Sequence, residues 1–237
     1  MTGEPWPYRV PLCEDELLSS FLIRNAHAHG TTPYRFLSYH WPGKHFWNRD
    51  TDRTADRDWL NELEAVAGIP TAQLEASTLL PFRRILGGAL HNGDTPMLLS
   101  VSVFHRTRRR HGLQFCPTCL AEGERWFRRA WRLGFVLVCP EHDTALKDAC
   151  PVCGSPVVPH RSVWLDPSRC HQCGAFLGKQ VRMELPQGGV FEWQRRLLDA
   201  LSGSSNVSGP FDASELFTSV RSLLSVLTIR PVHAVIR

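Results

Sequence analysis

The 237-residue chain has no long apolar run: no segment approaches the roughly 18 consecutive apolar residues that a membrane-spanning helix needs. Its beginning also lacks the charged and then apolar pattern of a secretory signal peptide. The apolar fraction of 43% is ordinary for a globular protein, and the length allows one or two compact domains. We therefore expect a cytoplasmic protein that makes no membrane contact.

The motifs of common catalytic sites are missing as well. The sequence contains no HExxH metalloprotease motif, no glycine-rich phosphate-binding loop, no nucleophile elbow and no paired-carboxylate motif. We therefore predict that the chain has no catalytic residues and is not an enzyme.

Metal-ligand residues, by contrast, are abundant in one part of the chain. Eight of them form four pairs in which two residues separate the members, a spacing that lets both side chains reach one tetrahedral ion. The pairs are Cys116/Cys119, Cys139/His142, Cys150/Cys153 and Cys170/Cys173. Eight ligands complete two four-coordinate sites with no open position, so we predict two structural Zn²⁺ ions. In a cytoplasmic chain, such cysteines favour zinc over disulfides.

The four pairs can be joined in two ways. Sequential pairing joins the first two pairs and the last two, and it makes the second site a C-x2-C-x16-C-x2-C ribbon. Crossed pairing is typical of RING ubiquitin ligases, which place fewer residues between the histidine and the next cysteine than the seven found here. We therefore favour sequential pairing. Gly154 and Gly174 each follow a second cysteine, where a tight turn needs positive φ.

Positive charge is concentrated between Arg83 and Arg132. This segment holds ten arginines and no lysine, against only three acidic residues. The excess predicts contact with a polyanion or an acidic protein surface. The candidate nucleic-acid-binding residues are Arg106, Arg108, Arg109, Arg110 and Arg128. Around Arg128 and Arg132, where arginines alternate with aromatic residues, a half-buried strand with a solvated face is an equally supported interpretation.

The expected fold is mainly α, with small zinc-ribbon β elements. We divide the chain into a helical, helix-turn-helix-like N-terminal domain (1–111), a tandem two-zinc region (112–180) and a C-terminal helical segment (181–237). Within the middle region, residues 126–138 are predicted to be extended. Helices are predicted for residues 190–201 and 211–229.

The helix-turn-helix-like unit is predicted from apolar residues at helical spacing. Its first helix is predicted to have an acidic first turn, residues 14–16, and to end at Gly30, and Thr32 caps the second helix. Thr54 is expected to cap a third helix that Gly68 ends. The second helix offers only one firm cation to a DNA groove, so a role in protein contact is at least as well supported.

Several segments together resemble the TniQ family. They are residues 15–24 (DELLSSFLIR), 115–120 (FCPTCL), 127–132 (FRRAWR), 138–143 (VCPEHD) and 150–154 (CPVCG), followed by Cys170 and Cys173. The resemblance extends over about residues 5 to 200, and the joining of Arg-x-x-Trp-Arg to Cys-Pro-x-His is specific to this family.

The resemblance implies a target-selection factor of a bacterial transposon, acting as an adaptor without catalysis. Such an adaptor links a target-bound complex to a TnsC-type AAA+ ATPase, which recruits the transposase. In CRISPR-associated transposons the target complex is an effector with guide RNA; in others it is a DNA site. Some members form homodimers. The candidate partner-binding residues are Trp6, Trp41, Trp47 and Arg129, although the tryptophans would equally suit a core. The alternatives are a zinc-dependent DNA-binding transcription regulator and a RING-like zinc module.

Overall fold

The computed structural model describes residues 4–87, 95, 97–99, 101, 113–123, 125–178, 190–202 and 215–220. Its α-helices are α1 (Leu18–Ala28), α2 (Pro33–His40), α3 (Thr51–Thr54), α4 (Arg57–Ala67), α5 (Thr71–Ala76), α6 (Leu80–Leu86), α7 (Pro117–Ala121) and α8 (Val190–Ser202). Three 3₁₀-helices are η1 (Phe46–Asn48), η2 (Arg129–Arg132) and η3 (Pro159–Arg161). Within these ranges, β structure consists of isolated antiparallel bridges. The predicted mainly α fold is confirmed.

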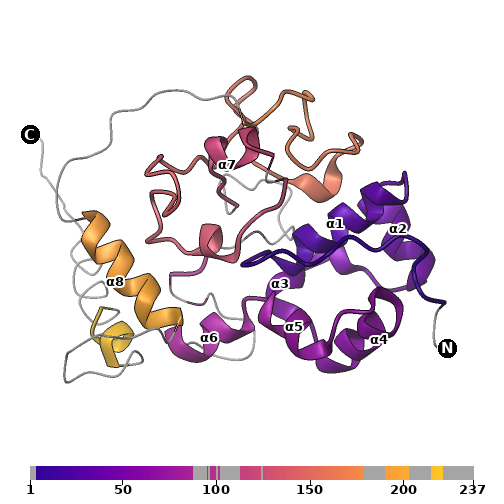
Figure 1. Ribbon diagram of the computed structural model, residues 1–237, viewed down its shortest axis with the longest axis horizontal. Coiled ribbons are helices and arrows are strands. Elements are labelled where there is room, and N and C mark those ends of the chain that lie inside the picture. Colours follow the sequence, from indigo (N-terminus) through magenta and orange to yellow (C-terminus); the bar gives the residue numbers. More distant parts are fainter. Residues whose placement is uncertain are drawn as a thin grey trace, which may run out of the picture.

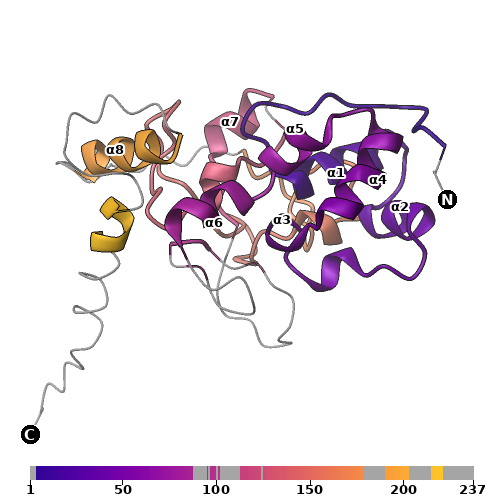
Figure 2. The same ribbon diagram turned by 90° about the horizontal axis from the view of Figure 1, so that it is seen from below.

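The N-terminal helices and α8 occupy opposite ends of the molecule, and α6 and α7 lie between them (Figure 1). Helices α1 to α5 gather at one end and α8 lies at the other (Figure 1), and the view turned by 90° shows the same arrangement (Figure 2). In the described residues, no helix combines the length and the hydropathy needed to cross a bilayer.

The N-terminal helices enclose an aromatic core. Trp6, Trp41 and Trp59 pack there with leucines of α1 and α4, and all three indoles are buried. Helix α4 is capped by Asp56, whose carboxylate accepts a hydrogen bond from the Trp59 amide at 2.8 Å. The expectation that Thr54 caps this helix was wrong, because Thr54 is the last residue of the separate short helix α3.

The acidic residues before α1 do not form its first turn, contrary to the prediction. The helix begins at Leu18, and the preceding residues bind specific cations instead. Glu16 is buried and accepts hydrogen bonds from Arg24 at 2.7 Å and from the Ser20 hydroxyl at 2.9 Å. The Asp15 carboxylate receives the Arg129 Nε proton at 3.0 Å. Asp15 therefore connects the start of α1 to the distant Arg129, whereas Glu16 is bound by two residues of α1 itself.

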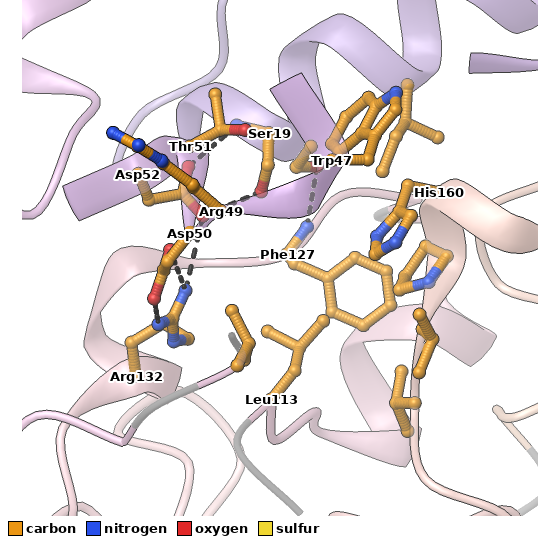
Figure 3. A pocket seen from close by; sticks show the side chains of 16 residues that line it. Ser19, Trp47, Arg49, Asp50, Thr51, Asp52, Leu113, Phe127, Arg132 and His160 are labelled. Carbon is orange, nitrogen blue, oxygen red and sulfur yellow. Dashed lines mark hydrogen bonds and ion pairs between the residues drawn. The ribbon is translucent and has the colours of Figure 1, made fainter. Parts of the chain in front are cut away.

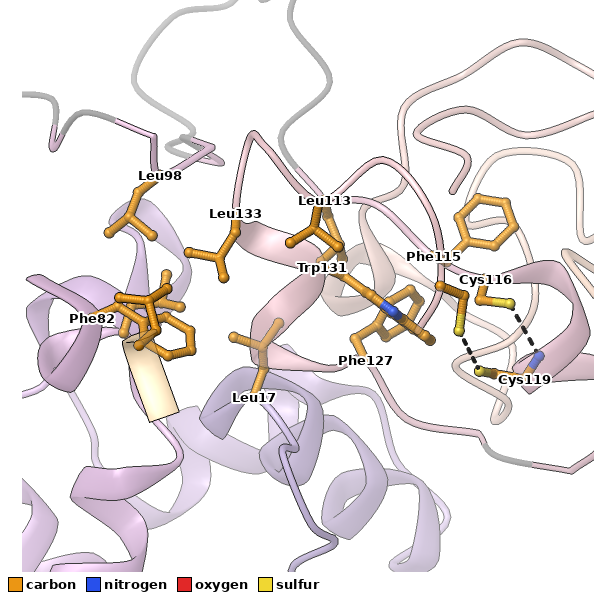
Figure 4. Packing of buried hydrophobic residues seen from close by; sticks show 14 of the residues in the cluster. Leu17, Phe82, Leu98, Leu113, Phe115, Cys116, Cys119, Phe127, Trp131 and Leu133 are labelled. Carbon is orange, nitrogen blue, oxygen red and sulfur yellow. Dashed lines mark hydrogen bonds between the residues drawn. The ribbon is translucent and has the colours of Figure 1, made fainter. Parts of the chain in front are cut away.

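A second core joins the N-terminal helices to the cysteine-rich region. Leu17 and Phe82 pack against Phe127, Trp131 and Leu133 (Figure 4). The same cluster continues to Cys116 and Cys119 and includes apolar residues of α8. Apolar packing thus crosses the domain boundary that the sequence suggested at residue 111.

Helix α8 is fastened to the cysteine-rich region by one polar side chain. The Gln194 carbonyl accepts the amides of Leu137 and Val138 at 2.8 and 3.1 Å, and its amide donates to the Val138 carbonyl at 2.7 Å. Gln194 thus pairs with the backbone as a neighbouring strand would, directly before Cys139. The predicted helix at 190–201 is confirmed, although Trp193 faces outward with 59% of its surface exposed. Of the predicted helix at 211–229, the described residues 215–220 are helical.

The segment of alternating arginine and aromatic residues is not a strand with a solvated face. Its centre is the 3₁₀-helix η2, and Arg132 is 1% exposed. The Arg132 guanidinium donates to both carboxylates of Asp50 and Asp52 and to the Leu99 carbonyl, the latter at 2.8 and 3.1 Å. Figure 3 shows Arg132 pointing at Asp50 beneath α3. The buried arginine therefore neutralises two buried carboxylates of the N-terminal helices.

Candidate metal centres

Four predicted ligands come together beside α7. The sulfur atoms of Cys116, Cys119 and Cys139 lie 3.8, 3.2 and 3.6 Å from Nδ1 of His142. Cys119 and Cys139 are 3.6 Å apart, sulfur to sulfur. Ligand atoms at the corners of a zinc tetrahedron are about 3.5 to 3.8 Å apart, given typical zinc–ligand bond lengths. This first metal centre fits a tetrahedral Zn²⁺ with one nitrogen and three sulfur ligands.

The remaining four ligands form a second cluster. Cys150 and Cys173 are 3.7 Å apart, as are Cys153 and Cys170, sulfur to sulfur. All four sulfur atoms lie within 4.8 Å of one another, so this second metal centre also fits a tetrahedral Zn²⁺. The two groups are those of sequential pairing. The crossed arrangement of a RING domain is therefore excluded.

Three of the four ligand pairs sit in turns of one shape. In each turn, the residue after the second ligand has positive φ and donates its amide to the carbonyl of the first ligand. These residues are Asp143 (φ 47°, 2.9 Å), Gly154 (φ 69°, 3.0 Å) and Gly174 (φ 73°, 2.9 Å). The two glycines agree with the sequence prediction, whereas Asp143 was not predicted; aspartate is one of the few other residues that tolerates this conformation.

The remaining pair, Cys116/Cys119, lies at the start of a helix instead of in such a turn. Cys116 is the N-cap of α7, and its sulfur accepts the Cys119 amide at 3.5 Å. Pro117 occupies the first helical turn, where its missing amide proton costs nothing. The first metal centre therefore joins one helix terminus to one turn, whereas the second joins two turns.

The two metal centres differ in exposure. All three cysteines of the first are buried, whereas Cys153 and Cys173 of the second are exposed. The Ser155 hydroxyl lies 3.0 Å from the Cys153 sulfur, and this hydrogen bond is the main reason why the pKa of that thiol is lowered to about 6. A low pKa favours the thiolate form, which is the form that binds metal.

The predicted nucleic-acid-binding residues are only partly covered by the structure. Arg106, Arg108, Arg109 and Arg110 lie outside the described residues. Arg128 lies over the Trp126 ring at 5.9 Å, and Arg24 lies over the same ring at 5.8 Å. Two guanidinium groups thus lie within cation–π distance of the same indole.

The predicted partner-binding residues fall into two groups. Trp6 and Trp41 belong to the N-terminal core, with 2% and 8% of their surfaces exposed, so in this conformation they cannot insert into a partner. Trp47 is half-buried and stacks on His160, with ring centres 4.8 Å apart. Burial lowers the pKa of His160 to about 3, so both stacked rings are neutral at physiological pH.

Arg129, the fourth predicted contact, lines an open groove of about 710 Å³. The groove lies between the segment before α1, α6, the first metal centre and the end of α8. Its walls are aromatic and charged, and they include Trp126, Arg128 and Glu141. Arg129 itself is held by Asp15 and by a hydrogen bond to the Ala76 carbonyl.

A second, smaller cavity of about 60 Å³ is lined by Phe127, Trp47 and the buried Arg132, among other residues (Figure 3). Its volume leaves room for about two waters at most. The cavity therefore offers no site for a larger ligand.

Two features of the site were missed in the sequence. Glu122 contacts the first metal centre, with its Oε2 atom 2.8 Å from Nε2 of His142. Its position three residues after Cys119, at the end of the helix that carries that ligand, was a usable local signal. The Arg132 cluster had no such signal, because Asp50 and Asp52 lie about 80 residues away.

Comparison with known proteins agrees with the motifs. No curated protein matches the chain. The family model TniQ matches residues 7–146, which is more than half of the 237 residues. The match covers the N-terminal helices and the whole first metal centre. The chain therefore belongs to the TniQ family of transposition-associated target-selection proteins.

Proposed function

We propose that this protein is a non-catalytic adaptor of DNA transposition. It binds a complex that marks the target and recruits a TnsC-type AAA+ ATPase, which in turn brings the transposase. The target-bound complex is either a CRISPR effector with its guide RNA or a DNA site. Family membership supports the transposition part of this proposal.

The observation that carries the adaptor role is the firm connection between the N-terminal helices and the first metal centre. Backbone hydrogen bonds join Leu17 to the Phe127 carbonyl at 2.9 Å and Arg129 to the Asp15 carbonyl at 2.7 Å. The Ser20 hydroxyl accepts the Phe127 amide at 2.9 Å, and the buried Arg132 adds its ion pairs. An adaptor needs two surfaces at a fixed separation, and these contacts supply that rigidity.

Both metal centres serve this rigidity in our proposal, each holding one structural zinc. Four ligands fill every corner of each tetrahedron, so neither centre has an open position for a substrate or a reactive water. Metal-dependent cleavage of DNA by the pure protein, abolished by a point substitution in this chain, would contradict the non-catalytic assignment.

We place the ATPase contact at the groove that Trp126, Arg128 and Arg129 line. Tryptophan and arginine contribute most to protein interfaces, and here they adjoin both the N-terminal helices and the first metal centre. Trp6, Trp41 and Trp47 do not line this groove, so the proposal assigns them no contact with the ATPase.

A pull-down tests the proposal. The bait is the full chain, and the prey is a TnsC-type AAA+ ATPase from the same organism, with nucleotide and DNA present. We expect association, weakened at least tenfold by Trp126→Ala, which removes a wall of the groove. Trp193→Ala is the matched control, because that indole is 59% exposed on α8 and does not line the groove. A complete lack of association under these conditions would end the adaptor proposal. If Trp126→Ala and Trp193→Ala bind the ATPase equally well, the contact does not lie at this groove.

A further inference from the structure

The carboxylate of Glu122 lies against the first metal centre although it is not one of the four ligands. Glu122 directly follows α7 as its C-cap, and its amide donates to the Thr118 carbonyl at 2.9 Å. Its Oε2 atom is 2.8 Å from Nε2 of His142, and Nδ1 of the same ring faces the three sulfur atoms. The imidazole is thus held between the sulfur cluster on one side and a carboxylate on the other.

This geometry selects one tautomer of the imidazole. A neutral histidine ligates a cation through its unprotonated nitrogen, so Nδ1 can bind only when the proton is on Nε2. A carboxylate next to Nε2 accepts a hydrogen bond from that proton and stabilises the required tautomer. The same contact fixes the direction of the ring and increases the electron donation of Nδ1.

The interaction belongs to the first metal centre alone. The four ligands of the second centre are cysteines, which as thiolates have no proton to donate. The side chain of Glu122 is 60% exposed, so as an ion pair it would contribute little to stability. Its effect should therefore appear in metal retention at one centre rather than in the stability of the whole chain.

We propose that Glu122 is the positioning residue of the first metal centre: it holds His142 with Nδ1 toward the ion and slows the loss of that ion. The proposal depends on zinc at both centres, which is part of the proposed function, but not on any partner of the adaptor. Outer hydrogen-bond partners of histidine ligands typically change metal affinity by about 10- to 100-fold.

The test measures zinc release from the full chain into the chromophoric chelator 4-(2-pyridylazo)resorcinol. In the Glu122→Ala variant, we expect one of the two ions to leave about 10- to 100-fold faster and the other to leave at the wild-type rate. Glu122→Gln keeps an acceptor oxygen without the charge, so its zinc release rate should lie between those of the wild type and Glu122→Ala. Glu141→Ala is the matched control, because it removes an exposed carboxylate next to His142 in sequence. We expect this control to release both ions at wild-type rates.

A second background separates an effect through the imidazole from a general effect on α7. In a His142→Cys protein the ligand has no N–H, so adding Glu122→Ala should leave metal release unchanged. Cobalt substitution identifies the affected centre, since a cobalt site with three sulfur ligands and one nitrogen ligand has a different spectrum from a site with four sulfur ligands.

Three results would overturn the proposal: equal release by wild type and Glu122→Ala, the same acceleration in the His142→Cys background, or fewer than two zinc ions in the wild-type protein. The assay involves no ATPase or DNA. A failure of the adaptor proposal in the pull-down would therefore be seen separately.

Discussion

Replacing Arg132 with methionine should destabilise the protein more than any surface ion pair could. The arginine is 1% exposed, and its partners Asp50 and Asp52 have side-chain exposures of 4% and 2%. Methionine fills much of the same space but leaves two carboxylates without a cation. Removing one partner of a buried ion pair costs about 3 to 5 kcal/mol. For a chain of this size, that loss corresponds to a fall in Tm of about 6 to 20 °C.

The defect should depend on pH. Burial is the main reason why the pKa of Asp52 is raised to about 6 from its ordinary value of 3.8, and the Arg132 charge opposes this rise. Without Arg132 the pKa rises further, so the folded state binds a proton over a wider pH range than the unfolded state. Stability of the variant should therefore fall as pH increases from 4 through the raised folded pKa. The difference from wild type should be larger at pH 8 than at pH 5.

The measurement is urea denaturation with saturating zinc, followed by far-UV circular dichroism at both pH values. Arg196→Met is the control: it removes an exposed pair with Glu192 and should cost about 0.5 kcal/mol or less. Adding Asp52→Asn to Arg132→Met should restore part of the stability at pH 8, because a neutral amide needs no counter-charge. A destabilisation below about 1 kcal/mol for Arg132→Met, or one independent of pH, would refute the reasoning.

The remaining predictions concern the metals and the arginine cluster. Purified protein should contain about two zinc ions by elemental analysis, and Cys150→Ala should retain about one, with the N-terminal helices still folded by circular dichroism; a variant that releases both ions would show that the centres are not independent. A chelator should remove zinc from the second centre first, because Cys153 and Cys173 are exposed whereas the cysteines of the first centre are buried; release in the opposite order would contradict this. Arg108→Ala with Arg109→Ala should reduce the salt dependence of duplex DNA binding by about one unit of slope for each phosphate that these arginines neutralise. An unchanged slope would mean that they bind no phosphates.

The metal centres were predictable because their information is local. Two ligands separated by two residues and followed by a residue that tolerates positive φ describe a turn almost completely, and Asp143 shows that glycine is not required there. The spacing of apolar residues also predicted α1, α2, α4 and α8. The predicted start of α1 was a few residues too early, because Asp15 contacts Arg129 instead of forming the first helical turn.

The interactions that join the two halves could not be predicted from local patterns. Arg132 occurs among aromatic residues at a spacing that fits a half-exposed strand, and only the distant Asp50 and Asp52 make its burial possible. Gln194 likewise has the sequence context of a solvent-facing helical residue, yet it pairs with the backbone beside Cys139. Such roles depend on a partner that lies more than 50 residues away.

The interlocking of the N-terminal helices with the segment around Phe127 limits how the protein can be dissected. Residues 1–111 expressed alone would leave Leu17 without its apolar cover and the carboxylates of Asp50 and Asp52 without a counter-charge. A fragment cut there would be prone to aggregation, and its failure to bind a partner would say little about the intact chain. Fragments meant to isolate the N-terminal helices should therefore continue beyond His142, so that they keep the packing residues up to Leu133 and all four ligands of the first metal centre.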